Sequence, residues 1–285
     1  MTEATAEQVG RYVLDGSDED LRRLLSISEV TAETARRAFR RVGICEGWTA
    51  IDCGCGPIGG LAVLAGMVGP AGRVIGVDFS EPAIQRARSV VAALGLENVE
   101  LAAGDIHDLD AATLGGPFDL AFTRCFLMHQ ADPVRTLGHI AGLLRPGGWI
   151  VAQEPLPSPP PRSHPHLSAL ATYWDLLHEV MDMAGAARGN VEGLERAARA
   201  AGLEVAEANG HFTTLDPRLG FEIHAATLAA ARERAVQSGV AAEKIDDLLL
   251  NFRAAKNGHY QWVSSPFILD LALRKPTEAS WPRHT

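Results

Sequence analysis

The sequence of 285 residues predicts an α/β fold, in which a mostly parallel sheet carries helices on both faces. Strand-like and helix-like patterns alternate from about residue 48 to residue 154. A glycine-rich segment joins the first of these strands to the first helix, and acidic residues stand at the ends of the first three strands. The apolar content of 47% is enough for one sizeable α/β core with some additions.

The first expected strand ends at a glycine-rich turn that is preceded by an acid. Gly54, Gly56 and Gly59 fit the pattern G-x-G-x-x-G, which lets a ligand approach the backbone closely at the start of a helix. These glycines alone would equally suit a nicotinamide dinucleotide. Asp52, however, would repel a pyrophosphate and attract an ammonium group. The turn therefore predicts a ligand with a cationic end.

The next two expected strands also lead to acids. The strand at 73–78 ends in Asp78, about as far downstream as a ribose-binding carboxylate should lie. The strand at 99–103 runs into Asp105, which could pair with an adenine amino group while Ile106 packs against the ring. Because parallel strands present their carboxyl ends at one edge of the sheet, the three acids should converge on one cleft.

Helices are expected between these strands at 58–68, 81–94 and 133–143. Ser80 with Pro82 marks the start of the second helix, and Gly95 marks its end. Before the core, the apolar spacing from Leu21 to Phe39 predicts amphipathic helices that act as a lid.

These motifs together resemble the class I S-adenosylmethionine-dependent methyltransferases, and within them the small-molecule group of the ubiquinone and menaquinone methyltransferases. The resemblance runs from about Tyr12 to Glu154 and includes D-x-G-x-G, the acid at 78, the Gly-Asp pair at 104–105 and the turn Leu-Arg-Pro-Gly-Gly at 144–148. It implies a Rossmann-like core with a seven-stranded, mostly parallel sheet and helical cap insertions. It also implies S-adenosylmethionine as the cofactor and S-adenosylhomocysteine as its product.

By this resemblance, the glycine turn would hold the methionine end, Asp78 the ribose and Asp105 the adenine. Tyr12 would close over the methionine carboxylate or simply pack, and Arg124 would shape the methionine pocket through its backbone. The chain departs from many relatives by having Ile58 before Gly59, so we expect a slightly shifted turn. The predicted cofactor-binding residues are Tyr12, Asp52, Gly54, Cys55, Gly56, Asp78, Phe79, Gly104, Asp105, Ile106 and Arg124.

The chain divides into alternating core and cap segments. A proline-dense stretch at 155–161 interrupts regular structure, and helices are expected at about 167–183 and 219–256. The expected segments are an N-terminal helical lid at 1–44, the cofactor-binding core at 45–154, a cap insertion at 155–190, a core continuation at 191–214, a helical cap insertion at 215–262, and the last core strand with a tail at 263–285. The acceptor pocket would be lined by side chains that could instead pack in a core: Tyr173, Trp174, His178, Phe221, His224 and Trp262.

Methyl transfer from a sulfonium is an in-line displacement that mainly needs alignment and the exclusion of water. A general base near the methyl group would help with some acceptors. His129, which follows the fourth strand, is the first candidate, and Glu154 at the end of the fifth strand is the second. Each has another interpretation, because His129 could cap the next helix and Glu154 could pair with Arg124 or contact the cofactor.

Composition excludes several partners. The formal charge of −9, without a Lys/Arg cluster, disfavours nucleic acid. No apolar run is long enough to span a bilayer and nothing resembles a signal peptide, so a cytoplasmic protein without a membrane partner is expected. Cysteines at 45, 53, 55 and 125 lack C-x-x-C spacing, and His164-x-His166 lacks a third ligand, so no metal site is expected.

The sequence therefore predicts an S-adenosylmethionine-dependent enzyme that methylates an O, C or N atom of a small molecule, as part of a biosynthesis. The same fold could instead bind this cofactor while catalysing another reaction such as a cyclisation, or serve as a non-catalytic binding module. A nicotinamide-dependent oxidoreductase is disfavoured by Asp52. An apolar lid and cap make a homodimer plausible.

Overall fold

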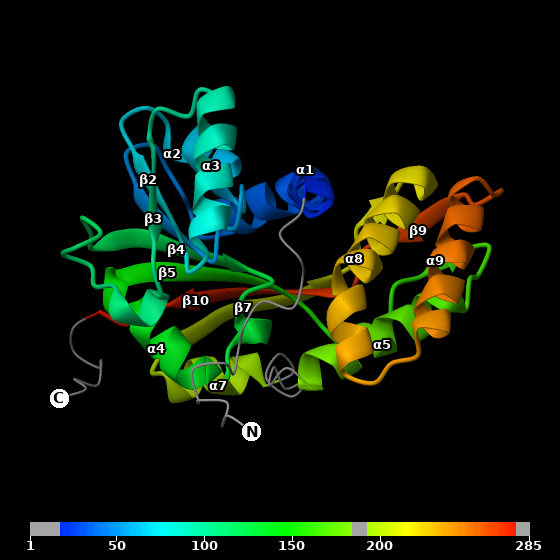
Figure 1. Ribbon diagram of the computed structural model, residues 1–285. Helices are drawn as coiled ribbons and strands as arrows, with labels where there is room; N and C mark the ends of the chain where they lie inside the picture. Colours follow the sequence, from blue (N-terminus) through cyan, green and yellow to red (C-terminus); the bar gives the residue numbers. More distant parts are fainter. Residues whose placement is uncertain (1–17, 184–192, 278–285) are drawn as a thin grey trace, which may run out of the picture.

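The computed structural model describes residues 18–183 and 193–277, which form a central sheet with helices on both of its faces (Figure 1). The strands of this sheet are β1 (Thr49–Cys53), β2 (Arg73–Asp78), β3 (Val99–Ala103), β4 (Phe118–Arg124), β5 (Leu144–Pro155), β7 (Glu204–His211) and β10 (Ile268–Arg274). They are hydrogen-bonded in the order β3-β2-β1-β4-β5-β10-β7. The five strands β3, β2, β1, β4 and β5 pair in parallel, while β10 is antiparallel to both of its neighbours, β5 and β7. The predicted seven-stranded, mostly parallel sheet is confirmed.

Helices cover the two faces of the sheet in two groups. Helices α1 (Asp18–Arg41), α2 (Leu61–Val68) and α3 (Glu81–Ala93) lie on one face, where Leu120 of β4 joins their buried residues. Helices α4 (Pro133–Leu143) and α7 (Leu194–Ala200) lie on the other face, around Ala121. Successive residues of a strand point to opposite faces, so the central strands β1, β2 and β4, which are covered on both faces, are mostly apolar along their length.

A second group of elements lies beyond the end of the sheet (Figure 1). It consists of helices α5 (Ala169–Met183), α8 (Pro217–Gln237) and α9 (Ala242–Lys256) and of a small sheet in the order β6-β9-β8, formed by β6 (Ser163–His164), β8 (Thr214–Leu215) and β9 (Trp262–Ser264). We call these six elements the cap. The cap has its own hydrophobic cluster, separate from the two that flank the large sheet.

Several boundaries differ from the predicted ones for identifiable reasons. Helix α2 begins at Leu61 rather than at residue 58, because Gly59 has a φ of +44° that does not fit a helix. The predicted helical stretch at 219–256 is two helices, separated at Gly239 with a φ of +93°. The described part of the N-terminal segment is one continuous helix, α1, instead of several.

Both chain excursions into the cap start or end at one place on the sheet. Pro155, the last residue of β5, is the register partner of Ile268, the first residue of β10. Ile268 is also the partner of His211, the last residue of β7. Two turns of 3-10 helix, η2 (Ile106–Asp108) and η3 (Leu127–His129), follow β3 and β4 at the carboxyl edge.

Candidate active site

Four neighbouring strands bring charged side chains to the carboxyl edge of the sheet. Asp52 lies next to the end of β1, and Asp78 is the last residue of β2. Arg124 ends β4, and Glu154 lies next to the end of β5. The strand order β2-β1-β4-β5 places these four positions along one edge. This edge is where open parallel sheets bind their ligands.

The glycine turn after β1 needs a backbone that glycine supplies. The angle φ is +74° at Gly54, +53° at Gly56 and +44° at Gly59, values that cost other residues energy. A Cβ atom at Gly59 would lie 2.5 Å from Oδ2 of Asp52, so this position cannot carry a side chain without movement. A Cβ atom at Gly56 would meet nothing within 4 Å. The space above Gly56 is open, as a cradle for a ligand requires.

Asp52 lies under this turn with only 1% of its surface exposed. Its Oδ2 accepts a hydrogen bond of 2.6 Å from the N–H of Gly60. Burial raises the pKa of Asp52 to about 7, although the Gly60 N–H and the charge of Arg124 act to lower it. A cation bound nearby would favour the carboxylate form. The Gly60 N–H therefore fixes Asp52 under the glycine turn, and its contact with the cationic end of a ligand stays a prediction.

Asp78 connects the end of β2 to the same turn. Its Oδ2 accepts from the N–H of Gly56 at 2.8 Å, and its Oδ1 accepts from the N–H of Ser80 at 2.9 Å. Burial raises the pKa of Asp78, and these two N–H groups oppose the rise. Each carboxylate oxygen has a further lone pair that could accept from a ribose hydroxyl. Phe79 beside it is a large apolar side chain with 57% of its surface exposed.

The predicted adenine end follows β3. The N–H of Gly104 donates to the backbone oxygen of Asp78 at 2.9 Å, which joins this loop to the end of β2. Asp105 is exposed, and its Oδ1 accepts from the N–H of His107 at 2.9 Å, capping η2. Ile106 is buried in the core below. Asp105 thus follows β3, the strand next to β2 and Asp78. Its other carboxylate oxygen, Oδ2, is not the one that caps the N-terminus of η2.

Helix α1 is tied to the glycine turn at the carbonyl oxygen of Gly59. Ser28 Oγ donates to this oxygen at 2.9 Å, and Arg124 Nη2 donates to it at 2.7 Å. Nη1 of Arg124 donates to Thr31 Oγ1 at 2.6 Å. The side chain of Arg124 therefore joins α1 to the glycine turn. From the sequence, Arg124 was expected to act through its backbone or to pair with Glu154, and no local pattern indicated Ser28 or Thr31.

The segment after β4 turns sharply back over the glycine turn. Cys125 is exposed and has a φ of +50°, a left-handed conformation that is uncommon outside glycine. The next residue, Phe126, lies against Gly54, because a Cβ atom placed on Gly54 would be 2.3 Å from Cδ2 of the phenylalanine ring. The sequence analysis gave Phe126 no role.

Glu154 is fully buried and holds the backbone of this segment. Its Oε1 accepts from the N–H groups of Phe126 at 3.1 Å and of Leu127 at 3.0 Å. Its Oε2 accepts from the N–H of Met128 at 3.3 Å. Burial raises the pKa of Glu154 to about 7, and these three N–H groups act against the rise. Among the contacts described, Glu154 forms no ion pair with Arg124. Its side chain is also not exposed, as a general base that reaches an acceptor would need to be.

His129 lies at the end of η3, half-buried, on the same segment. Its backbone N–H donates to the carbonyl oxygen of Phe126 at 3.0 Å. Burial lowers the pKa of the His129 imidazole to about 4. The ring is therefore neutral at pH 7 and can accept a proton, although it is a weaker base than an exposed histidine. The N-terminus of the following helix, α4, is capped by the side chain of Asp132 and not by His129.

The aromatic side chains expected around an acceptor pocket mostly pack with one another in the cap. Tyr173 and Phe252 meet edge to face with ring centroids 5.3 Å apart, and Nε2 of His224 lies 3.0 Å from the carbonyl oxygen of Ser264. Five of the six residues are buried in the described structure, while Trp262 is half-buried. The core interpretation therefore describes those five. Tyr12 lies outside the described residues.

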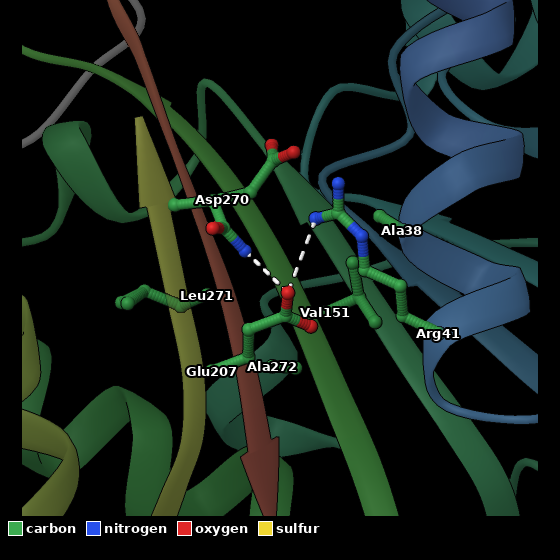
Figure 2. A pocket seen from close by; sticks show the side chains of 8 residues that line it. Ala38, Arg41, Val151, Glu207, Asp270, Leu271 and Ala272 are labelled. Carbon is green, nitrogen blue, oxygen red and sulfur yellow. Dashed lines mark hydrogen bonds and ion pairs between the residues drawn. The ribbon is translucent and has the colours of Figure 1, made fainter. Parts of the chain in front are cut away.

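A small cavity lies elsewhere, between α1 and the strands β5, β10 and β7 (Figure 2). Glu207 lies 3.6 Å from Nη1 of Arg41 and accepts from Asn209 at 2.6 Å at this cavity. Its volume of about 10 Å³ has room for one water molecule. It is far too small for a nucleoside ligand, so the carboxyl edge remains the candidate site.

Residues 18–183 and 193–277 contain no group of three or more His, Cys, Asp or Glu side chains that could hold a metal ion. Within the same ranges, no helix combines the length and the apolar character needed to cross a membrane. A homodimer and a cytoplasmic location stay predictions.

Known proteins share this architecture and parts of this sequence. A family model described as "Methyltransferase domain" matches residues 44–196, just over half of the chain. An uncharacterized 37.1 kDa protein in transposon TN4556 of Streptomyces fradiae is 44% identical over 134 residues, which cover 45% of this chain and 38% of that protein. The demethylmenaquinone methyltransferase of Bacillus cytotoxicus is 32% identical over 119 residues, which cover 42% of this chain and 49% of that protein. The chain thus spans less than half the length of these curated relatives.

Among solved structures, the [4+2]-cyclase SpnF is similar with a TM-score of 0.51 and 18% sequence identity. The alignment covers 86% of this chain and 82% of the cyclase. At this identity the likeness is one of fold. The family match covers the glycine turn, the acids after the first three strands, and Glu154.

Proposed function

This chain belongs to the family of proteins with the methyltransferase domain, and we propose that it transfers the methyl group of S-adenosylmethionine to a small-molecule acceptor. One observation carries the proposal, namely the open glycine turn flanked by Asp52 and Asp78 at the ends of neighbouring strands. A turn of this kind fits a ligand with a cationic amino-acid end and a ribose. When bound, S-adenosylmethionine supplies an electrophilic methyl group on a sulfonium.

We assign the parts of the cofactor to residues along the carboxyl edge. Asp52 would face the ammonium group through its charge, and Asp78 would accept from the ribose hydroxyls. Phe79 and Ile106 would offer apolar surface to the adenine, and Asp105 would accept from its amino group. These assignments use the open space above Gly56 and the free lone pairs of the acids.

The proposed acceptor is a small, partly apolar metabolite. The relative from Bacillus cytotoxicus is named for a demethylated menaquinone, which is such a molecule. The net charge of −9 argues against a polyanionic acceptor such as nucleic acid. In the proposed division of roles the core binds the cofactor, and the cap, with its separate hydrophobic cluster, faces the acceptor.

We propose His129 as the group that takes a proton from the acceptor, because its half-buried imidazole follows β4 at the carboxyl edge and is neutral at pH 7. His129→Ala is then expected to lower turnover by about 10²-fold without a comparable loss of cofactor affinity. Steady-state kinetics and calorimetry with S-adenosylhomocysteine measure the two effects. His259→Ala, at an exposed position in the loop after α9, is the matched control. Unchanged turnover of His129→Ala at saturating acceptor would remove His129 from this role.

The first test is a calorimetric titration of the purified protein with S-adenosylmethionine, S-adenosylhomocysteine and NADH in parallel. Binding of the two adenosyl ligands without NADH supports the proposal, whereas binding of NADH alone overturns it. Acceptor screens then follow S-adenosylhomocysteine release. A substrate that is converted without any release of S-adenosylhomocysteine would favour a cyclisation or rearrangement, in which the cofactor is bound but not consumed.

A further inference from the structure

We propose that Glu154 is a positioning residue, whose carboxylate fixes the backbone of residues 126–128 and thereby holds Phe126 against the glycine turn that binds the cofactor. This inference rests on the proposed function, since it assigns the cofactor to that turn. It gives Glu154 a role that differs from the general base expected from its place in the sequence.

The described side-chain hydrogen bonds of Glu154 all go to the segment after β4 or to β4 itself. Three successive backbone N–H groups, at residues 126, 127 and 128, donate to its two oxygens at 3.0 to 3.3 Å. Thr123 Oγ1 lies at the limit of hydrogen bonding, 3.5 Å from Oε1. The side chain has no exposed surface. A carboxylate enclosed in this way does not contact a bound methyl acceptor directly. It affects the site only through the backbone that it positions.

A carboxylate suits this place better than its neutral relatives do. It offers acceptor lone pairs on both oxygens and no donor, while the three N–H groups are all donors. A protonated acid or an amide would turn one donor toward a backbone N–H and lose at least one of the bonds. The raised pKa of about 7 shows how strongly burial opposes the charge. The three N–H groups lower the pKa of Glu154. Without the carboxylate, these N–H groups would be left unpaired in the core.

The backbone held by Glu154 carries Phe126 to the glycine turn. Cys125 provides the reversal with its φ of +50°, and its N–H donates to the carbonyl oxygen of Gln153 at 3.0 Å. The ring of Phe126 then lies so close to Gly54 that no Cβ atom fits between them. A ligand in the turn must lie beside this ring, so the position of the ring affects how the cofactor is bound.

The experiment compares Glu154→Gln, Phe126→Ala and the double variant in the full chain. Phe126→Ala removes the ring and leaves the anchor, so it does not depend on whether Glu154→Gln folds normally. Each single variant is expected to raise the dissociation constant of S-adenosylhomocysteine by about tenfold, measured by calorimetry. Because both act through the same ring, the double variant should bind about as weakly as the weaker single variant and not multiplicatively worse.

The matched control is Asp270→Asn, which also changes a buried acid into its amide. Asp270 lies on the neighbouring strand β10, accepts from Gln153 at 2.9 Å, and has no described contact with residues 125–129. Its variant should bind S-adenosylhomocysteine as the unchanged protein does. If both Glu154→Gln and Phe126→Ala bound as tightly as this control, the positioning role would be refuted.

A base and a positioning residue differ in what else they change. Glu154→Gln could abolish turnover at saturating cofactor while the variant still binds S-adenosylhomocysteine as tightly as the unchanged protein. Glu154 would then act on the reacting atoms, and the inference would be wrong. Hydrogen–deuterium exchange of the ligand-free protein tests the anchor without any cofactor. Exchange in residues 123–130 should be faster in Glu154→Gln than in Asp270→Asn, and equal exchange would refute the anchor even if the protein bound no adenosyl ligand.

Discussion

At the scale of single residues, we expect the proposed contact of Asp52 with the cofactor to make binding depend on pH. Its pKa of about 7 in the folded protein means that the acid is largely protonated below that pH, and a ligand ammonium group favours the carboxylate. S-adenosylhomocysteine should therefore bind more weakly as the pH falls below about 7, by up to about tenfold per pH unit. Calorimetry in buffers of different ionisation enthalpy should detect proton release on binding at pH 6.

The variant Asp52→Asn cannot release this proton. It is expected to bind more weakly at pH 8 and to lose most of the pH dependence between 5 and 7. The same slope in the variant and in the unchanged protein would assign the dependence to another group, for which Glu154 is the other buried acid at this edge with a pKa of about 7.

Asp78 offers a second prediction at this scale. Asp78→Ala removes the acceptor of the ribose hydroxyls and should weaken cofactor binding by about 1–3 kcal/mol. The same change frees the N–H of Gly56, so a thermal melt must accompany the calorimetry. Glu97→Ala, an exposed acid in the loop before β3, provides the control. If Asp78→Ala bound no more weakly than Glu97→Ala, the ribose assignment would be lost.

How far the residues of the site could be predicted depended on the range of the contacts involved. Asp52, Asp78 and Asp105 could be located because strand ends and glycines are visible in a local stretch of sequence. Phe126 could not, since its contact with Gly54 depends on a reversal at a non-glycine residue, Cys125. The burial of Glu154 likewise comes from the packing of two strands and a turn that are distant in the sequence.

At the scale of elements, helix α1 and the cofactor turn share a connection through Arg124. Thr31→Val removes the oxygen that accepts from Nη1 of Arg124 and leaves a guanidinium N–H without this partner. We expect S-adenosylhomocysteine to bind about fivefold more weakly, because Arg124 also holds the carbonyl oxygen of Gly59. Calorimetry checks the affinity.

The control for this variant is Thr34→Val on the same helix. The hydroxyl of Thr34 donates at 2.7 Å to the carbonyl oxygen of Thr31 within α1, so it has the same chemistry without the contact to β4. Equal affinity of the two variants would mean that the contact between Thr31 and Arg124 does not influence the turn. The sequence predicted α1 as a lid from its apolar spacing, but spacing does not identify which polar residues face the site.

At the scale of the whole molecule, the cap and the core have separate hydrophobic clusters. Phe252→Ala, at a fully buried position of α9, should lower the free energy of unfolding by about 3–5 kcal/mol. Leu250→Ala on the same helix is 58% exposed and should have little effect. Tryptophan fluorescence in urea measures both. The affinity for S-adenosylhomocysteine should be retained in Phe252→Ala, and a loss comparable to that of Asp78→Ala would show that cap packing reaches the cofactor site.

The sequence indicated helices in the segments of the cap but not whether the cap's aromatic side chains line a pocket or fill a core. Periodicity and proline density locate helices and connectors, because these are local properties. Whether an aromatic ring lines an opening or fills a core depends on how helices from distant segments meet. Tyr173 and His224 lie on different helices, and their rings pack together with centroids 5.4 Å apart.

The antiparallel strand β10 has a consequence for how such a protein can diversify. Since Pro155, Ile268 and His211 are neighbours in one row, the chain leaves the sheet after β5, leaves it again after β7 and returns to it at β10, all at nearly a single point. Segments mounted in this manner can be lengthened or exchanged while the strands that carry Asp52 and Asp78 keep their register. Evolution could therefore change the cap segments, and with them the acceptor, while the strands that carry Asp52 and Asp78 stay unaltered.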